Sequence, residues 1–204
     1  MLDDDSTIVE EAVVEKMGGA LSKQLPAIFL VGPMGAGKTT IGKLLAKHLG
    51  RQFVDCDWHI VQQTGADIPW IFEKEGESGF RDRETRALAE LTVLPDIVMA
   101  TGGGAVERLE NRELLKNGLV IYLDASVDTQ LARTKKDKNR PLLQSDNPRA
   151  VLELLYERRN PLYREVADVI MPTGRAFPKQ MIGDILLALE SYVDAIATDF
   201  GQMQ

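Results

Sequence analysis

The sequence predicts an α/β protein built on a five-stranded parallel sheet, and three observations support this class. Apolar runs typical of buried strands alternate with stretches of helical periodicity from residue 27 onward. The first apolar run leads into a glycine-rich turn, and two later runs end in acidic or glycine-rich segments. A length of 204 residues suits one domain with a proper core.

The elements follow each other in regular alternation. The predicted strands cover residues 27–31, 51–55, 96–100, 119–123 and 168–172. The predicted helices cover residues 38–49, 57–65, 69–76, 79–93 and 107–116, with another from about residue 128 and a last one over 178–197. The segment TKKDKNRPLLQSDNP, residues 134–148, interrupts this pattern. A loop of this length inside a compact domain is usually functional or disordered, and its position between two helices suits a lid.

The two ends of the chain differ from the part between them. Residues 1–25 contain a capping box at Thr7–Glu10 and apolar residues at helical spacing, and Gly18-Gly19 ends this pattern. We expect a flexible extension or short amphipathic helix there, either a weakly docked appendage or a partner-binding element. Residues 26–197 form the single main domain, and residues 198–204 form a tail.

Composition excludes several classes of protein. Lys and Arg number 24 against 31 Asp and Glu, and the net charge of −7 argues against a protein that coats nucleic acid. One cysteine cannot form an internal disulfide. The acidic N-terminus lacks the layout of a signal peptide, and no apolar run approaches the roughly 20 residues that span a bilayer. We therefore expect a cytoplasmic protein with neither nucleic acid nor membrane as a partner.

A phosphate-binding motif follows the first strand. The sequence GPMGAGKT at residues 32–39 fits G-x-x-x-x-G-K-[ST] and stands between a predicted strand and a predicted helix, the context that this motif needs. Its backbone N–H groups would surround phosphate oxygens, Lys38 would reach the β- and γ-phosphates, and the Thr39 hydroxyl would ligate Mg²⁺. The sequence therefore predicts a nucleoside triphosphate site. The residues expected to bind the nucleotide here are Gly35, Ala36, Gly37, Lys38, Thr39 and Thr40.

The stretch FVDCDWH at residues 53–59 admits a metal cluster, a redox thiol or a pair of functional carboxylates. If extended geometry persists through Asp57, then Asp55 and Asp57 share a face and Cys56 points to the other one. This favours Cys56 as a core residue and His59 as a structural residue on a helix. One carboxylate could then hold the Mg²⁺ shell and the other could accept a hydrogen bond from a substrate hydroxyl; a solvated strand end is the alternative.

Glycines and arginines complete the candidate site. Thr101–Gly104 follows a buried strand and offers either N–H donors for an anion or a plain tight turn. Arginines are expected at the start of the helix after Gly79-Phe80, in the lid, and at the end of a helix before Asn160-Pro161: Arg81, Arg83, Arg140, Arg158 and Arg159. Any one of them alone would be an ordinary surface residue. Beside a triphosphate site, they indicate an anionic small substrate and a lid that supplies positive charge.

Taken together, these motifs resemble the shikimate kinase family. The segments that carry the resemblance are GPMGAGKTTIGKLLAKHLG, FVDCDWHI, TGADIPWIFEKEGESGFRDRE, ATGGGAV, RPLL and ERRNPLYREVADV, and they lie within about residues 26–195. The resemblance implies a three-layer α/β/α sandwich like that of nucleoside monophosphate kinases, with strand order 2-3-1-4-5 and a mobile lid. It also implies a monomeric enzyme that uses Mg²⁺ and transfers the γ-phosphoryl group of ATP to the 3-hydroxyl of shikimate, on the way to aromatic amino acids.

The resemblance also assigns roles to individual residues. Shikimate would be held by Asp57, Arg81, Gly103, Gly104 and Arg159, with the arginines on its carboxylate. Asp57 would be the catalytic base, and Asp55 would support Mg²⁺ through water. Lys38 and Arg140 would act on the transferred phosphate, while Arg133 and the region around Pro178 would border the adenine. Glu84 would orient Arg81.

Two other functions are compatible with parts of this pattern. A related kinase could phosphorylate gluconate or a nucleoside monophosphate, although two arginines and an aspartate favour a hydroxy acid over a nucleotide. A nucleotide-binding regulator without catalysis is the other alternative. The presence of Lys38, Thr39, Asp57 and Arg140 argues against it.

Overall fold

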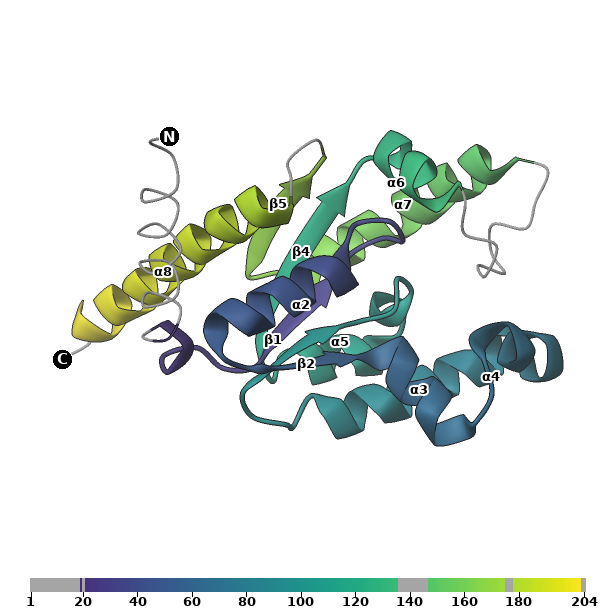
Figure 1. Cartoon of the computed structure of the whole chain (residues 1–204), viewed down its shortest axis with the longest axis horizontal. Helices are drawn as coiled ribbons and strands as arrows, with labels where there is room; N and C mark the ends of the chain where they lie inside the picture. The colour runs from purple at the N-terminus through teal and green to yellow at the C-terminus, as the bar shows by residue number, and fades with distance from the viewer. Residues whose placement is uncertain (1–18, 20, 136–146, 175–177, 203–204) are drawn as a thin grey trace, which may run out of the picture.

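The computed structural model describes residues 19, 21–135, 147–174 and 178–202, and it contains the expected parallel sheet (Figure 1). Its strands are β1 (Ile28–Val31), β2 (Gln52–Asp55), β3 (Ile97–Ala100), β4 (Leu119–Ala125) and β5 (Val169–Thr173). They lie in the order β2-β3-β1-β4-β5, and every neighbouring pair is parallel. The predicted fold class and strand order are confirmed.

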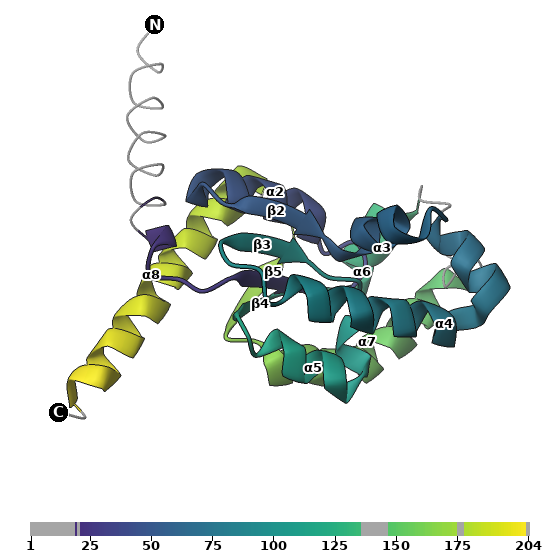
Figure 2. The same cartoon turned by 90° about the horizontal axis from the view of Figure 1, so that it is seen from below.

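Helices cover both faces of the sheet. They are α2 (Lys38–Leu49), α3 (Cys56–Thr64), α4 (Ile68–Leu91), the 3₁₀ turn η1 (Ala105–Glu107), α5 (Leu109–Leu115), α6 (Val127–Thr134), α7 (Pro148–Val166) and α8 (Pro178–Gln202). Figure 2 shows α2 on one side of the sheet and α5 and α7 on the other. Within the described part of the chain, no helix has the length and apolarity needed to cross a membrane.

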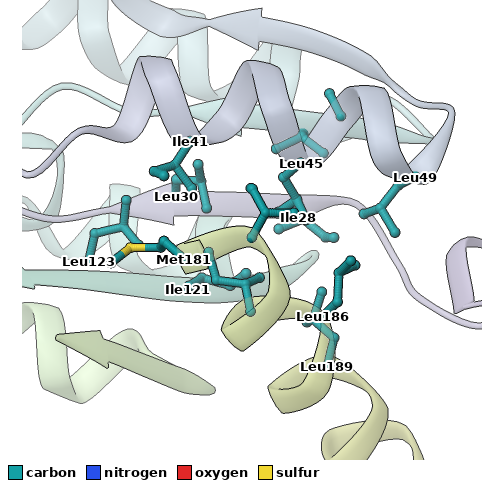
Figure 3. Packing of buried hydrophobic residues seen from close by; sticks show 14 of the residues in the cluster. Ile28, Leu30, Ile41, Leu45, Leu49, Ile121, Leu123, Met181, Leu186 and Leu189 are labelled. Carbon is teal, nitrogen blue, oxygen red and sulfur yellow. The ribbon is translucent and has the colours of Figure 1, made fainter. Parts of the chain in front are cut away.

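Burial on both faces explains why the strands are continuous apolar runs in the sequence. Ile28 and Leu30 of β1 point into a cluster with residues of α2 and α8 (Figure 3). Phe29 and Val31 point into a second cluster, on the side of α3, α4 and α5. All four side chains are fully buried. This double packing makes β1 the rigid base from which the phosphate loop emerges.

The chain joins the domain before residue 26. Leu21 and Leu25 are buried in the cluster that contains α2 and α8. Arg51 donates hydrogen bonds to the carbonyl oxygens of Ser22, Leu25 and Pro26, which ties this segment to the start of β2. Residues 1–18 and the end of the predicted tail lie outside the described residues, so the division at residue 25 stays a prediction.

Local structure departs from the sequence-based expectations at the end of α7. The helix that contains Arg158 and Arg159 was expected to end before Asn160-Pro161, but α7 continues to Val166 with Pro161 inside it. Burial of Tyr163, which is 1% exposed, offsets the hydrogen bond that a proline removes from a helix. The predicted helices over 69–76 and 79–93 are both present, because α4 consists of two helical segments that meet at a kink at Gly76 (φ 70°).

Candidate active site

The phosphate loop joins β1 to α2 at the carboxyl end of the strands. Gly37 precedes α2 with φ 99°, a left-handed conformation in which other residues are strained. The Nζ atom of Lys38 donates hydrogen bonds to the carbonyl oxygens of Gly32 (2.7 Å) and Pro33 (3.0 Å), so it lies over the loop. The loop and the start of α2 present N–H groups and a helix dipole to an anion. This arrangement suits the phosphates of a nucleotide.

The two residues predicted to serve Mg²⁺ are in direct contact. The Thr39 hydroxyl donates a hydrogen bond to Asp55 Oδ2 at 2.8 Å. Oxygen donors of this kind are the ligands that Mg²⁺ prefers. The described residues contain no group of three or more His, Cys, Asp or Glu that could hold a metal ion. The pair therefore fits a magnesium ion that keeps water and phosphate ligands, and not an all-protein metal cage.

The geometric premise for Asp55 and Asp57 was wrong. Extended backbone ends at Asp55, which caps α3 by accepting hydrogen bonds from the N–H groups of Asp57 (3.1 Å) and Trp58 (3.3 Å). Asp57 thus lies in the first turn of a helix, because the aspartate side chain satisfies N–H groups that a helix start leaves open. Both carboxylates still lie at the carboxyl edge of the sheet.

Cys56 and His59 have the structural places expected for them. Cys56 is fully buried in an apolar cluster, and burial, followed by the charges of Asp57, Glu84 and Asp55, raises the pKa of its thiol. A neutral buried thiol is a poor metal ligand and nucleophile. His59 lies on α3 with its ring 3.0 Å from Glu90 at the surface.

Arg81 is a buried cation held by acidic side chains. It is 8% exposed, and its Nη1 donates to Glu84 Oε2 at 2.8 Å while its Nη2 donates to Glu77 Oε1 at 2.9 Å. Glu84 is fully buried. Burial raises the pKa of Glu84 to about 7, and Asp57 adds to the rise, while Arg81 and Arg159 oppose it. The expected contact by which Glu84 orients Arg81 is present.

The glycine-rich turn after β3 lies between the arginines and the phosphate loop. A Cβ atom at Gly104 would stand 2.2 Å from Nη2 of Arg81, so glycine is required for this close approach. The carbonyl oxygen of Gly103 accepts a hydrogen bond from the Tyr163 hydroxyl of α7. A Cβ atom at Gly103 would stand 3.5 Å from the backbone nitrogen of Met34 in the phosphate loop. The turn therefore brings α4, α7 and the phosphate loop together.

Arg159 completes this group, and it meets a residue that sequence reasoning missed. Arg159 is 3% exposed on α7 and faces Glu107 of η1, with Nε 3.2 Å from Glu107 Oε1 and Nη2 3.3 Å from Oε2. Arg81 Nη2 lies 3.5 Å from the same Oε2. Arg158 also forms an ion pair with Glu107. Arg81 and Arg159 thus converge on one carboxylate, that of Glu107.

A separate cavity of about 210 Å³ lies beside the phosphate loop. It is lined by Ala36, Gly37, Thr40, Ile41, Arg133, Thr173, Pro178 and Met181. Arg133 donates to the carbonyl oxygens of Gly35 (3.0 Å) and Ala36 (3.3 Å), which fixes it against the loop. The predicted nucleotide residues other than Arg140 lie in or next to this cavity. Arg140 and most of the predicted lid, residues 134–148, lie outside the described residues.

Sequence reasoning did not find three of the residues that line this cavity. Ile41, Thr173 and Met181 line it together with the expected residues. The buried hydroxyl of Thr173 has no hydrogen-bond partner among the described residues. Thr173 is the last residue of β5, where it pairs with Ala125 of β4, so tertiary structure and no local motif places it beside the loop.

Fold and site geometry define a P-loop kinase that acts on a small molecule. The family model described as shikimate kinase matches residues 34–190. A shikimate kinase of Psychrobacter cryohalolentis is 64% identical over 178 residues, which cover 87% of this chain and 96% of the relative. The chain belongs to the shikimate kinase family and is an ATP-dependent kinase.

Solved structures agree with this assignment. The structure described as shikimate kinase from Acinetobacter baumannii in complex with shikimate has a TM-score of 0.82 and 53% identity, and the match covers 85% of this chain and 97% of that one. A gluconokinase from Sinorhizobium meliloti 1021 has a TM-score of 0.54 at 13% identity, with 85% and 96% covered. At that identity, the second likeness concerns the fold alone.

Proposed function

We propose that this chain transfers the γ-phosphoryl group of ATP to the 3-hydroxyl of shikimate, giving shikimate 3-phosphate and ADP. The observation that carries the proposal is the convergence of two buried guanidinium groups, Arg81 and Arg159, on one carboxylate beside the phosphate loop. Paired guanidinium groups bind carboxylates with defined geometry. A hydroxy acid could place its carboxylate there and its hydroxyl groups toward Asp57. The description of the Acinetobacter baumannii structure, shikimate kinase in complex with shikimate, agrees with this substrate.

In this proposal, positioning and charge provide most of the catalysis. The substrate oxygen forms a bond to the γ-phosphorus while the bond from that phosphorus to the β–γ bridging oxygen breaks. The hydroxyl proton passes to the Asp57 carboxylate. Lys38 offsets the charge on the β- and γ-phosphates, and Arg140 adds charge from the lid. Gly103 and Gly104 contribute backbone that approaches the substrate closely.

Magnesium would be held beside the phosphates by Thr39 directly and by Asp55 through water. The contact between these side chains in the structure supports this pairing, because it places two oxygen donors together at the foot of the loop. Bound Mg²⁺ supplies charge neutralisation for the β- and γ-phosphate oxygens.

The nucleotide would lie along the phosphate loop and in the adjoining cavity. Gly35, Ala36, Gly37 and Thr40 would bind its phosphates, and Arg133 and Pro178 would border the adenine. We further propose that the enzyme is a cytoplasmic monomer with small molecules as its only substrates and with neither nucleic acid nor membrane as a partner. The net charge of −7 supports the exclusion of nucleic acid.

The test is ADP release coupled to NADH oxidation, with ATP and Mg²⁺ present and the acceptor varied. We expect turnover with shikimate and background rates with gluconate and nucleoside monophosphates. Turnover with one of the other acceptors, and none with shikimate, would refute the proposed substrate. ADP release independent of every acceptor would instead indicate an ATPase.

A further inference from the structure

Glu107 occupies the arginine pair that the proposed function assigns to the substrate. Its carboxylate accepts a hydrogen bond from Nη2 of Arg159 at 3.3 Å and lies 3.5 Å from Nη2 of Arg81. The side chain is 18% exposed, so water screens these contacts only in part. A substrate carboxylate bound by the same two guanidinium groups would need the donor atoms that Glu107 uses.

Arg158 gives Glu107 a second partner on the solvent side. The Arg158 side chain is 56% exposed and pairs with Oε1 of Glu107, whereas Arg159 is buried. The two arginines are neighbours on α7 and therefore point in different directions from the helix. Glu107 can remain paired with Arg158 while the buried arginines turn to another carboxylate.

The charges around the pair make this exchange costly for an incoming acid. Arg81 is also paired with Glu77 and Glu84, while the ion pairs of Arg159 among the described residues are with Glu107 alone. Burial alone would raise the pKa of Glu107, but the hydrogen bond and charge of Arg159, and the charges of Arg158 and Arg81, lower it below its ordinary value. Glu107 is therefore a full negative charge at neutral pH and repels an incoming acid.

We propose that Glu107 competes with the carboxylate of the substrate for Arg81 and Arg159. The substrate carboxylate can bind these two arginines only when Glu107 moves away from them and stays paired with Arg158. The inference rests on the proposed function, since it assumes that these arginines bind the acid. Competition of this kind lowers the affinity for every acid by the same factor, so only an acid with further contacts, such as hydroxyl contacts, still binds usefully. Glu107 thus sets the affinity of the site for acids and does not touch the reacting atoms.

The competing explanation makes Glu107 a positioning residue that holds the arginines in the correct place for the substrate. The two explanations predict opposite effects for Glu107→Gln, which keeps the shape of the side chain and removes its charge. Competition predicts tighter binding of shikimate. Positioning predicts weaker binding.

The experiment is calorimetric titration of wild type, Glu107→Gln and the control Glu113→Gln with shikimate. Glu113 is an exposed residue of α5 that pairs with Lys116, so the control removes one charge and one ion pair outside the site. We expect Glu107→Gln to bind shikimate roughly fivefold more tightly, the effect of losing one partly screened like-charge interaction. We also expect sodium sulfate to inhibit shikimate-dependent ADP release by this variant at a lower concentration than it inhibits wild type. The control should match wild type in the titration and in the inhibition assay.

Unchanged or weaker shikimate binding by Glu107→Gln would overturn the inference. If wild type binds shikimate in the same titrations, that result leaves the proposed function intact. Failure of wild type to bind shikimate would instead refute the proposed function, and the inference with it.

A second variant tests the withdrawal to Arg158 and stays informative if Glu107→Gln does not fold. Arg158→Gln should weaken shikimate binding several-fold in the chain that retains Glu107. The Glu107 carboxylate would then have no arginine to pair with once shikimate occupies Arg81 and Arg159. The same substitution should have little effect in the Glu107→Gln background, as a double-mutant cycle would show. Equal effects in both backgrounds, or no effect of Arg158→Gln in wild type, would contradict the withdrawal.

Discussion

Glu84→Gln tests the electrostatics of the buried group that orients Arg81. The Glu84 carboxyl is fully buried, and burial raises its pKa to about 7, against 4.5 for the exposed side chain. Glutamine has nearly the same shape and can still accept a hydrogen bond from Arg81, but it does not titrate. Comparing the two proteins at each pH cancels the contributions of the other titrating groups.

The size and sign of the effect follow from linkage. The folded-state pKa lies above the unfolded one, so protonated Glu84 stabilises the folded state below about pH 4.5, and this contribution is lost as the pH rises through about 7. Each pKa unit corresponds to about 1.4 kcal/mol, which gives a loss of about 3 kcal/mol. The stability of Glu84→Gln relative to wild type should therefore rise by about 3 kcal/mol between pH 4.5 and pH 8.

Urea unfolding followed by tryptophan fluorescence measures this difference. Wild type and Glu84→Gln would be unfolded at several pH values from 4.5 to 8, and the difference in the free energy of unfolding plotted against pH. A difference independent of pH would refute a raised pKa for Glu84. A difference that falls as the pH rises would mean that Arg81 dominates over burial.

Three further substitutions test the site. Asp57→Asn should abolish phosphoryl transfer and leave ATP binding nearly unchanged in calorimetry, because the proton acceptor is lost but the phosphate loop is intact; near-normal turnover would remove Asp57 from its proposed role. Arg159→Ala should raise the KM for shikimate by at least about tenfold with little change in the KM for ATP, as expected for loss of a charge-assisted hydrogen bond; an unchanged KM for shikimate would argue against the carboxylate grip. Gly104→Ala should weaken shikimate binding strongly, since its Cβ atom would stand 2.2 Å from Nη2 of Arg81; normal affinity would show that Arg81 can move without loss of function.

Features that depend on local sequence were predictable. The strands were expected within about two residues of their observed ends because a parallel sheet buried on both faces requires apolar runs. The phosphate loop was predictable because its glycines and Lys38 perform a task that few other residues can perform. The contact between Arg81 and Glu84 follows from their spacing of three residues on one helix.

Features that depend on tertiary packing were not predictable. The alternation of side chains along a strand placed Asp55 and Asp57 correctly at the sheet edge. It did not predict that the strand ends at Asp55 and that Asp55 caps α3. The end of α7 was misplaced because Pro161 is a strong local stop signal, and the burial of Tyr163 overrides it. Glu107 was missed because it meets Arg159, 52 residues later, only when η1 and α7 pack together.

The measurement that tests the central claim most directly is shikimate-dependent ADP release by the purified chain, with ATP and Mg²⁺ present. The proposed function predicts that shikimate raises the rate of ADP release far above the rate without acceptor, and that ³¹P NMR detects a phosphate monoester formed in equal amount. No increase with shikimate, in a protein that binds ATP normally, would contradict the account.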